Sequence, residues 1–326
     1  MSKLQLLNIM LLKKLTLPEL LSNSCSKFKN NLSLNFVQSG KRTYQDFYNE
    51  VTSIANYLLS SGIQKGDKIA ILSANMPNWG ITQFAIARIG AIAVPVLPGF
   101  SSIEIQNILE HSESKIIFVS KLLYKLVADI KTSYLEQKIL MNTFARIPED
   151  YPVEAIDKLE NNIGLDNLTP LPAIQVEEED TASIIYTSGT TGFSKGVELT
   201  HRNLVWNARQ CATIQPVSIQ DRFLSILPLA HTYENTLGLL LPVMFGAQIY
   251  YLDRVPTPKL LVPAMQKIRP TVMLSVPLII EKIYKTQVLP KFTSSALMKT
   301  LYNFGPTRKL FNRLAGKKLM QTFGGK

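Results

Sequence analysis

One polar stretch of the sequence has the composition of a site that binds phosphate groups. Residues 184–203 read IIYTSGTTGFSKGVELTHRN, so a short apolar run leads into residues that are only Thr, Ser and Gly, and a lysine follows. Glycines let the backbone turn tightly and approach a ligand, and consecutive N–H groups in such a turn can bind an anion. Hydroxyl groups add donors, and a lysine balances phosphate charge. The residues that indicate this polyphosphate site are Thr187, Ser188, Gly189, Thr190, Thr191, Gly192 and Lys195.

The spacing of this loop differs from that of the common P-loop. The P-loop motif is G-x-x-x-x-G-K-[ST], with its lysine directly after the second glycine. Here Lys195 follows Gly192 by three residues, and Gly196 comes next. A flexible surface turn is the simpler interpretation of a Ser, Gly and Thr run. The phosphate interpretation is favoured because the run lies between a predicted strand and a helix-like segment and carries a lysine.

The elements that must position this loop alternate between helices and apolar strands. Residues 42–63 have apolar side chains at helical spacing, and residues 67–75 are a short apolar run that predicts a buried strand. A helix and a strand follow up to Val96, and the same order repeats up to Ser120. This alternation predicts an α/β fold in which layers of parallel sheet are flanked by helices.

The pattern changes near the middle of a chain that is long enough for two domains. Residues 141–179 are less regular and end in an acidic run, which predicts a connecting segment. We therefore predict a first α/β subdomain at residues 1–175, which includes the N-terminal segment and the linker, and a second at residues 176–326, which carries the loop. Further strands are expected at 222–229, 248–252 and 271–280, with helices from Asn203, at 235–246 and at 258–270.

The overall composition is that of a globular protein in a reducing compartment. Hydrophobic residues are 46% of the chain and charged residues 18%. The net charge is +11, but the Lys and Arg residues are scattered, so we predict no nucleic-acid partner. Cys25 and Cys211 are far apart in the sequence, so no disulfide framework or zinc site is expected. These features favour a cytoplasmic location.

The N-terminal segment offers a weak membrane signal. Residues 4–12 form a short apolar run without a small-residue cleavage site, which argues against a signal peptide. Two interpretations stay open for this run: packing on the domain surface, which we favour, and peripheral membrane contact. No stretch of the sequence reaches about 18 uncharged apolar residues, so no spanning helix is predicted.

The loop and its flanks carry a specific resemblance. Residues 186–203 resemble the YTSGTTGxPKGVxLTHxN signature of the AMP-forming adenylating enzymes, the superfamily of acyl-CoA synthetases, luciferases and adenylation domains. Ser194 departs from the signature, which usually has proline there. Residues 227–235, LPLAHTYEN, resemble a second signature found in long-chain fatty acyl-CoA synthetases. Together with similar landmarks at residues 16–21, 42–51, 62–79 and 90–96, the resemblance covers nearly the whole chain and is greatest to the long-chain fatty acid–CoA ligase branch.

The resemblance implies a two-step ligase reaction on the N-terminal large-domain part of the adenylate-forming fold. A fatty acid carboxylate attacks the α-phosphorus of ATP, giving an acyl-adenylate and pyrophosphate. The thiolate of coenzyme A then attacks the acyl carbon, and AMP leaves. Charge that develops on the leaving pyrophosphate must be stabilised by preorganised donors, a lysine and Mg²⁺. ATP, Mg²⁺ and coenzyme A are therefore the implied cofactor and co-substrates.

The resemblance also implies roles for individual residues. The loop from Thr187 to Gly192, with Lys195, would hold the β- and γ-phosphates, and Thr187 would contact Mg²⁺. His231 would lie at the edge of the acyl site as a catalytic and substrate-pocket residue, although a lone histidine after an apolar strand is usually structural. Tyr233 would line the same pocket. Glu234 is open between a surface ionic partner and an orienting residue.

Other residues in these motifs are expected to be structural. His201 is expected to be a structural helix-start residue, and His111 is expected at the exposed end of a helix. The apolar runs at 236–245 and 272–280 are open between an acyl tunnel and ordinary core.

Three motifs of the same family are absent from the 326 residues. They are YGxTE, which supplies an adenine contact and a Mg²⁺-binding glutamate, TGD with its ribose-binding aspartate, and the C-terminal segment with the catalytic lysine. We therefore expect an incomplete C-terminal end, a missing small domain that could be separately encoded, and no activity of this part alone. The alternatives are a fatty acyl-AMP ligase and a non-catalytic module that binds nucleotide or acyl groups.

Overall fold

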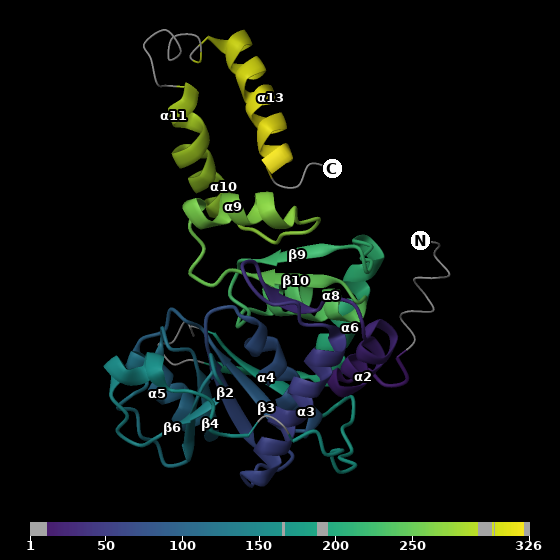
Figure 1. Cartoon of the computed structure of the whole chain (residues 1–326), viewed down its shortest axis with the longest axis vertical. Coiled ribbons are helices and arrows are strands. Elements are labelled where there is room, and N and C mark those ends of the chain that lie inside the picture. Colours follow the sequence, from purple (N-terminus) through teal and green to yellow (C-terminus); the bar gives the residue numbers. More distant parts are fainter. Residues whose placement is uncertain (1–11, 165–166, 188–194, 293–301, 303, 323–326) are drawn as a thin grey trace.

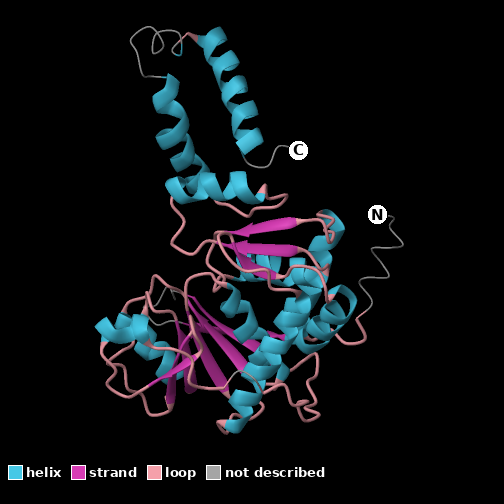
Figure 2. Ribbon diagram, in the orientation of Figure 1, coloured by secondary structure: helices cyan, strands magenta, loops and turns pink. Residues whose placement is uncertain are grey.

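Two sheets and several layers of helices make up the computed structural model of the chain (Figure 1). The structure describes residues 12–164, 167–187, 195–292, 302 and 304–322. A large sheet and a small sheet are separated by helices, and α9 (Pro258–Ile268) covers the far side of the small sheet (Figure 2). This arrangement confirms the predicted α/β fold with flanking helices.

The bounds of the elements follow the predicted alternation. The strands are β1 (Leu34–Phe36), β2 (Lys68–Leu72), β3 (Ile92–Val96), β4 (Ser114–Val119), β5 (Gln137–Leu140), β6 (Ala145–Ile147), β7 (Thr181–Thr187), β8 (Lys195–Thr200), β9 (Arg222–Ser225) and β10 (Gln248–Tyr251). The first helices are α2 (Leu17–Phe28), α3 (Tyr44–Ser60), α4 (Pro77–Arg88), α5 (Ser102–His111) and α6 (His201–Ile214), with 3₁₀ turns η1 (Tyr124–Leu126) and η2 (Val153–Lys158). Then come α7 (Thr232–Glu234), the π-helix η3 (Asn235–Leu240), α8 (Leu241–Met244), α9, α10 (Pro277–Ile283), the π-helix η4 (Tyr284–Val288), α11 (Leu289–Phe292) and α13 (Gly305–Thr322).

The large sheet has seven strands in the order β6-β5-β4-β2-β3-β7-β8. Its central strands are parallel, while β6 pairs with β5 and β8 pairs with β7 in antiparallel fashion. The sheet is therefore parallel in its centre, as predicted, and mixed at its two edges. The small sheet is wholly parallel, in the order β1-β10-β9.

The strand pairing crosses the predicted subdomain boundary at residues 175 and 176. β7 and β8 come after the boundary, but they join the sheet that the earlier strands form. β1 comes from the N-terminal part and pairs with β10, with Leu34 opposite Ile249. The division at this boundary stays a prediction, and the two sheets do not follow it.

Buried apolar side chains lie on both faces of the large sheet. One cluster joins α2, α3 and α4 to α6, η3 and α8, and it includes Trp79, Phe84 and Leu239. A second cluster packs α5 and η1 against the other face, with Ile108 and Tyr124 among its members. Helix α4 contacts strands of both sheets, so it fixes one sheet relative to the other.

Local sequence signals explain most helix starts. Thr43, Ser101 and Thr200 each close a capping box with the residue three positions later, which satisfies backbone N–H groups at the first turn. The predicted strand at residues 271–280 is wrong: Val272 makes a single bridge to Phe223, and α10 begins at Pro277. Proline at the first helical position favours that helix start. No helix within the described residues is long and apolar enough to span a membrane.

Candidate active site

The predicted phosphate loop connects two antiparallel strands at the edge of the large sheet. β7 and β8 pair so that Thr187 lies directly opposite Lys195, and both residues are exposed. Ser188, Gly189, Thr190, Thr191 and Gly192 lie outside the described residues. Because β7 runs parallel to β3, Thr187 lies at the carboxyl edge of the parallel strands. In open α/β sheets, ligands bind at this edge.

A contact that the sequence did not predict supports the base of this hairpin. The Tyr186 hydroxyl, one residue before Thr187, lies 2.6 Å from Nδ1 of His111, and the two rings meet edge to face. His111 is the last residue of α5 and is exposed, as predicted. A β-carbon on Gly196, which lies opposite Tyr186, would come within 3.3 Å of that tyrosine ring. The tyrosine side chain therefore joins α5 to both strands below the loop.

His201 is a buried structural residue at the start of α6, as predicted. Its Nδ1 accepts a hydrogen bond of 3.3 Å from the backbone N–H of Leu17, and its side chain is fully buried. Nε2 has no hydrogen-bond partner among the described residues. Burial lowers the pKa of His201 to about 4, although nearby Asp180 acts in the opposite direction. The imidazole is therefore neutral near pH 7.

His231 and Tyr233 lie in a short exposed segment that follows the small sheet. The strand β9 ends at Ser225, and His231 directly precedes α7. The backbone N–H of His231 donates to the carbonyl of Pro228 at 3.0 Å, and both side chains are exposed. Their roles at an acyl site stay predictions, and exposed side chains at this position are free to meet a ligand.

Glu234 is buried, which excludes one of the two interpretations that the sequence left open. Its side chain is 1% exposed, and Oε1 accepts a hydrogen bond of 2.6 Å from Ser225 Oγ. Burial raises the pKa of the Glu234 carboxyl to about 8, although the bond from Ser225 acts in the opposite direction. Glu234 is therefore not a surface ionic partner, and an orienting role for it stays a prediction.

The apolar run at residues 236–245 is core rather than cavity lining. Leu239, Leu240, Val243 and Phe245 are buried in the cluster between the sheets. None of them lines the cleft or the larger cavity described below.

A cleft of about 230 Å³ lies where the carboxyl ends of strands from both sheets meet. Phe36, Ser225 and Leu252 come from the ends of the small sheet, and Asn75 and Ser120 follow strands of the large sheet. Lys121 and Arg254 add positive charge to an otherwise largely apolar wall. The sequence did not predict this cleft because its walls come from segments far apart along the chain.

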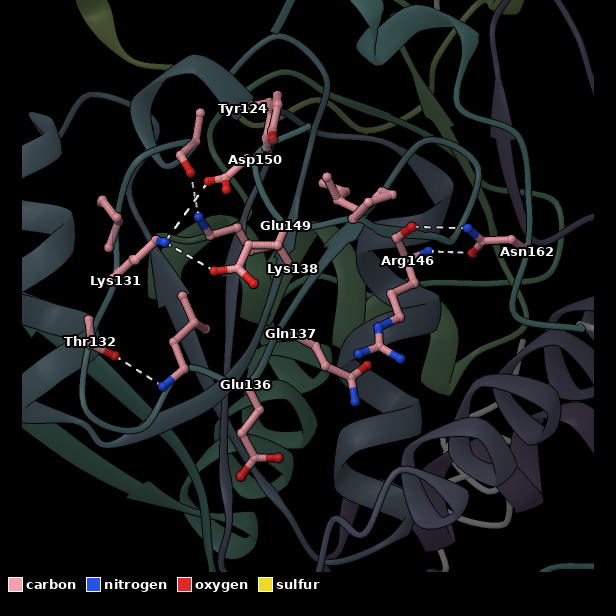
Figure 3. Close-up of a pocket in the computed structure, with 15 residues that line it drawn as sticks. Tyr124, Lys131, Thr132, Glu136, Gln137, Lys138, Arg146, Glu149, Asp150 and Asn162 are labelled. Carbon is pink, nitrogen blue, oxygen red and sulfur yellow. Dashed lines mark hydrogen bonds and ion pairs between the residues drawn. The ribbon is translucent and has the colours of Figure 1, made fainter. Parts of the chain in front are cut away.

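A larger cavity of about 670 Å³ lies at the opposite, amino end of β5 (Figure 3). Both lysines that line it have partners: Lys131 Nζ lies 3.0 Å from Glu149 Oε1 and 3.9 Å from Asp150 Oδ1. Lys138 Nζ donates to the carbonyl of Ala128 at 2.5 Å. The ammonium groups of both lysines are therefore already occupied by polar partners of the protein itself.

The described residues contain no group of three or more His, Cys, Asp or Glu side chains that could hold a metal ion. Thr187 is exposed at the end of β7. Its contact with Mg²⁺ stays a prediction.

Comparisons with known proteins agree with these features. A family model described as AMP-binding enzyme matches residues 21–323. The long-chain-fatty-acid–CoA ligase FadD15 of Mycobacterium bovis is 31% identical over 249 residues, which cover 73% of this chain and 39% of the relative. The long-chain-fatty-acid–CoA ligase of Bacillus subtilis is 24% identical over 335 residues, which cover 95% of this chain and 59% of the relative. The chain thus spans about half the length of the curated relatives it matches.

Solved structures show the same fold. The fatty acyl CoA synthetase of Mycobacterium tuberculosis matches with a TM-score of 0.69 and 21% identity, over 85% of this chain and 52% of that one. The N-terminal domain of FACL13 from the same organism matches with a TM-score of 0.69 and 20% identity, over 85% of this chain and 66% of that one. At this level of identity the likeness concerns the fold alone.

Proposed function

The chain belongs to the family of AMP-binding enzymes, and we propose that it is part of an ATP-dependent long-chain fatty acid–CoA ligase. In the first step, a carboxylate oxygen of the fatty acid bonds to the α-phosphorus of ATP, and the bond to pyrophosphate breaks. In the second step, the coenzyme A thiolate bonds to the acyl carbon, and AMP leaves with the electron pair. Fatty acid, ATP and coenzyme A are the substrates of this reaction.

The observation that carries the proposal is the register of the β7–β8 hairpin. Thr187 and Lys195 lie opposite each other at the carboxyl edge of the large sheet, so the loop between them starts and ends with phosphate-binding groups. We assign phosphate binding to this loop and to Lys195, and Mg²⁺ contact to Thr187. Mg²⁺ would neutralise charge on the leaving pyrophosphate when it is bound.

The acyl group is assigned to the segment after β9. His231 and Tyr233 are exposed, and they follow in sequence Ser225 and Pro228, which line the cleft, so the proposal places the acyl group near this segment. The relatives named as long-chain fatty acid ligases support a fatty acid as the carboxylate substrate. The cytoplasmic location stays a prediction. The choice between surface packing and membrane contact for residues 4–12 stays open, because most of this apolar run lies outside the described residues.

The phosphate assignment is tested by replacing Lys195. In a version of the chain that is extended through the later motifs of the family, Lys195→Ala should lower fatty-acid-dependent ATP–pyrophosphate exchange about tenfold or more, the scale of losing one donor at a transition state. The melting temperature should change little because Lys195 is exposed. Lys29→Ala, which removes another exposed lysine, is the control and should keep full exchange. Unchanged exchange in Lys195→Ala would refute the assignment.

Thioester formation separates the proposed ligase from its alternatives. With a panel of fatty acids, ATP, Mg²⁺ and coenzyme A, the extended version should release AMP and form acyl-CoA. Release of pyrophosphate without thioester would identify a fatty acyl-AMP ligase. Binding of ATP or fatty acid without any pyrophosphate release would identify a non-catalytic module.

A further inference from the structure

Three polar side chains connect the two sheets to the segment that carries His231 and Tyr233. Asn75 follows β2 in the large sheet, Ser225 ends β9 in the small sheet, and Glu234 ends α7. Asn75 Nδ2 donates to Ser225 Oγ at 2.9 Å, and Ser225 Oγ donates to Glu234 Oε1 at 2.6 Å. The serine hydroxyl accepts one bond and donates the other, so the three side chains form a directional chain of hydrogen bonds.

The Asn75 amide also holds the backbone of the segment before His231. Nδ2 donates to the carbonyl of Leu227 at 2.5 Å, and Oδ1 accepts from the backbone N–H of Leu229 at 2.9 Å. The amide therefore forms hydrogen bonds to the residues on both sides of Pro228. The carbonyl of Pro228 itself accepts a hydrogen bond from the backbone N–H of His231. Moving Asn75 would move the backbone from which His231 projects.

Glu234 holds the same segment from its other end. Its carboxyl fits beside Gly238 in η3, where a β-carbon would lie 2.5 Å from Oε1, so only glycine leaves room. Oε2 has no hydrogen-bond partner among the described residues, and no cation acts on the carboxyl. An ionised carboxylate with one hydrogen bond would be strongly disfavoured at this buried position, so the carboxyl group beside Gly238 is the neutral acid.

A second polar pair fixes the next residue. Asn235 and Gln83 exchange two amide hydrogen bonds, of 3.0 and 3.2 Å, and both side chains are buried. Gln83 lies on α4, the helix between the sheets. The segment from Leu227 to Asn235 is thus held by polar bonds to β9, to α4 and to the turn after β2, and π-helical turns such as η3 often occur at functional sites.

We propose that Asn75, Ser225 and the neutral carboxyl of Glu234 act as positioning residues, which hold the backbone of residues 227–234 so that His231 and Tyr233 meet substrate at the cleft. The catalytic meaning of this positioning rests on the proposed function of His231 and Tyr233. The positioning itself does not, and it can be measured without turnover. The rival explanation is that the three side chains only add stability to the fold.

Nuclear magnetic resonance of the histidine rings measures the positioning directly. The chain has three histidines, so the His231 resonance is the one that disappears in His231→Gln. Asn75→Ala and Glu234→Ala should shift this resonance by more than its line width, while Glu234→Gln, which keeps the shape and the acceptor oxygen, should leave it in place. The His111 and His201 resonances should stay unchanged in all three variants.

A matched control separates positioning from stability. Leu140→Ala removes a buried side chain from the second core cluster and lowers stability without touching Asn75, Ser225 or Glu234. Leu140→Ala should leave the His231 resonance in place. If Asn75, Ser225 and Glu234 only added stability to the fold, Glu234→Ala would also leave this resonance in place. If Glu234→Ala does not fold, Ser225→Ala removes only the bridging hydroxyl and decides the question. Folded Ala variants with an unmoved His231 resonance would overturn the proposal.

Infrared spectroscopy tests the neutral state of the carboxyl. At pH 7 the chain should show the carbonyl band of a protonated carboxyl, and Glu234→Gln should remove it. Glu154→Gln, at an exposed glutamate, should leave the band. Absence of the band from the native chain would show that Glu234 is ionised and would overturn this part of the proposal. Neither experiment depends on Lys195. A failure of the phosphate assignment would appear only in the exchange assay of Lys195→Ala, so it can be distinguished from a failure of the positioning proposal.

Discussion

At the scale of single residues, two buried titratable side chains give the fold opposite responses to pH. His201 and Glu234 are both buried, and both are neutral near pH 7. Burial penalises the charged form of each, so it lowers the pKa of the imidazole and raises the pKa of the carboxyl. The histidine therefore favours the folded state at higher pH, and the carboxyl favours it at lower pH.

His201 should make the protein less stable as the pH falls from 6.5 towards 4. The pKa is about 4 in the folded chain and 6.5 in the unfolded chain, so the unfolded chain binds more protons in this window. The free energy of unfolding should lose about 3 kcal/mol across it, from a pKa difference converted at about 1.4 kcal/mol per unit. In His201→Gln this loss should be absent, as measured by urea unfolding at a series of pH values. His111→Gln is the control, and an identical loss in His201→Gln would contradict the assignment.

Glu234 should make the protein less stable as the pH rises from 4.5 towards 8. The folded pKa of about 8 lies above the unfolded value of 4.5, so the folded chain binds more protons in this window. The full effect is up to about 5 kcal/mol by the same conversion. Glu234→Gln cannot ionise, so its melting temperature should fall less between pH 5 and pH 8 than that of the native chain. Equal slopes in the native chain and in this variant, with Glu154→Gln as reference, would show that Glu234 does not titrate in this range.

At the scale of elements, a tight turn joins α8 to β10 and sets the position of the small sheet. Gly246 has φ +69°, and its N–H follows the end of α8 as in a helix that stops at a left-handed glycine. A β-carbon there would lie 2.4 Å from Cγ of Phe28 in α2. The turn therefore depends on glycine for its conformation and for the close approach of another helix.

Gly246→Ala should lower the free energy of unfolding by roughly 2–4 kcal/mol, because it adds backbone strain and a clash with a ring. Gly66→Ala is the matched control: its φ is +89°, but nothing lies within 4 Å of the new β-carbon. The control should lose only the backbone part, about 1–2 kcal/mol. Denaturant unfolding of both variants measures the difference, and equal losses would show that Phe28 moves aside without penalty.

The elements show what a single sequence can and cannot predict. Alternating helices and apolar strands predicted the α/β fold, and His201 was expected at a helix start, where α6 does begin. The prediction of a strand at 271–280 was wrong because a helix begins there at Pro277. A short apolar run alone does not distinguish a strand from a helix. The sequence also could not predict which strands pair. Leu34 pairs with Ile249, more than half of the chain away, and local periodicity carries no information on such distant partners.

The candidate site was predictable in the same uneven way. Residue types and spacing predicted a polyphosphate loop between a strand and a helix-like segment, but the structure has a strand, β8, after the loop, with Thr187 opposite Lys195. Phosphate binding by this loop stays a prediction. The burial of Glu234 was not predictable, because a glutamate after HTY at the end of an apolar strand is compatible with surface or core. Its slot is made by Gly238 one turn later and by Ser225 on another element, and their approach depends on tertiary packing.

At the scale of the whole molecule, residues at the carboxyl ends of parallel strands from both sheets line one cleft. Asn75, Ser225 and Leu252 bring three strand ends to that cleft, and Thr187 lies at the same edge of the large sheet. The groups proposed to bind phosphate and those proposed to meet the acyl chain therefore come from different sheets. A reaction between ATP and a fatty acid at this place requires both sheets to be held in one geometry.

The last prediction concerns what these 326 residues can catalyse. They hold the phosphate hairpin and the His231 segment, but they contain no YGxTE or TGD motif and no later segment with the catalytic lysine. Groups that act together at one transition state are strongly non-additive, so the loss of a whole set should abolish turnover. The purified chain with ATP, Mg²⁺, coenzyme A and palmitate should therefore form no acyl-CoA.

Addition of a separately expressed C-terminal part that carries the missing motifs should restore thioester formation, and Lys195→Ala in the 326-residue chain should remove it again. Turnover by the 326 residues alone would contradict this division of roles between the two parts. Absence of turnover from the combined parts, with ATP binding intact, would instead favour a nucleotide-binding module, because the phosphate hairpin can bind without the groups that complete the chemistry.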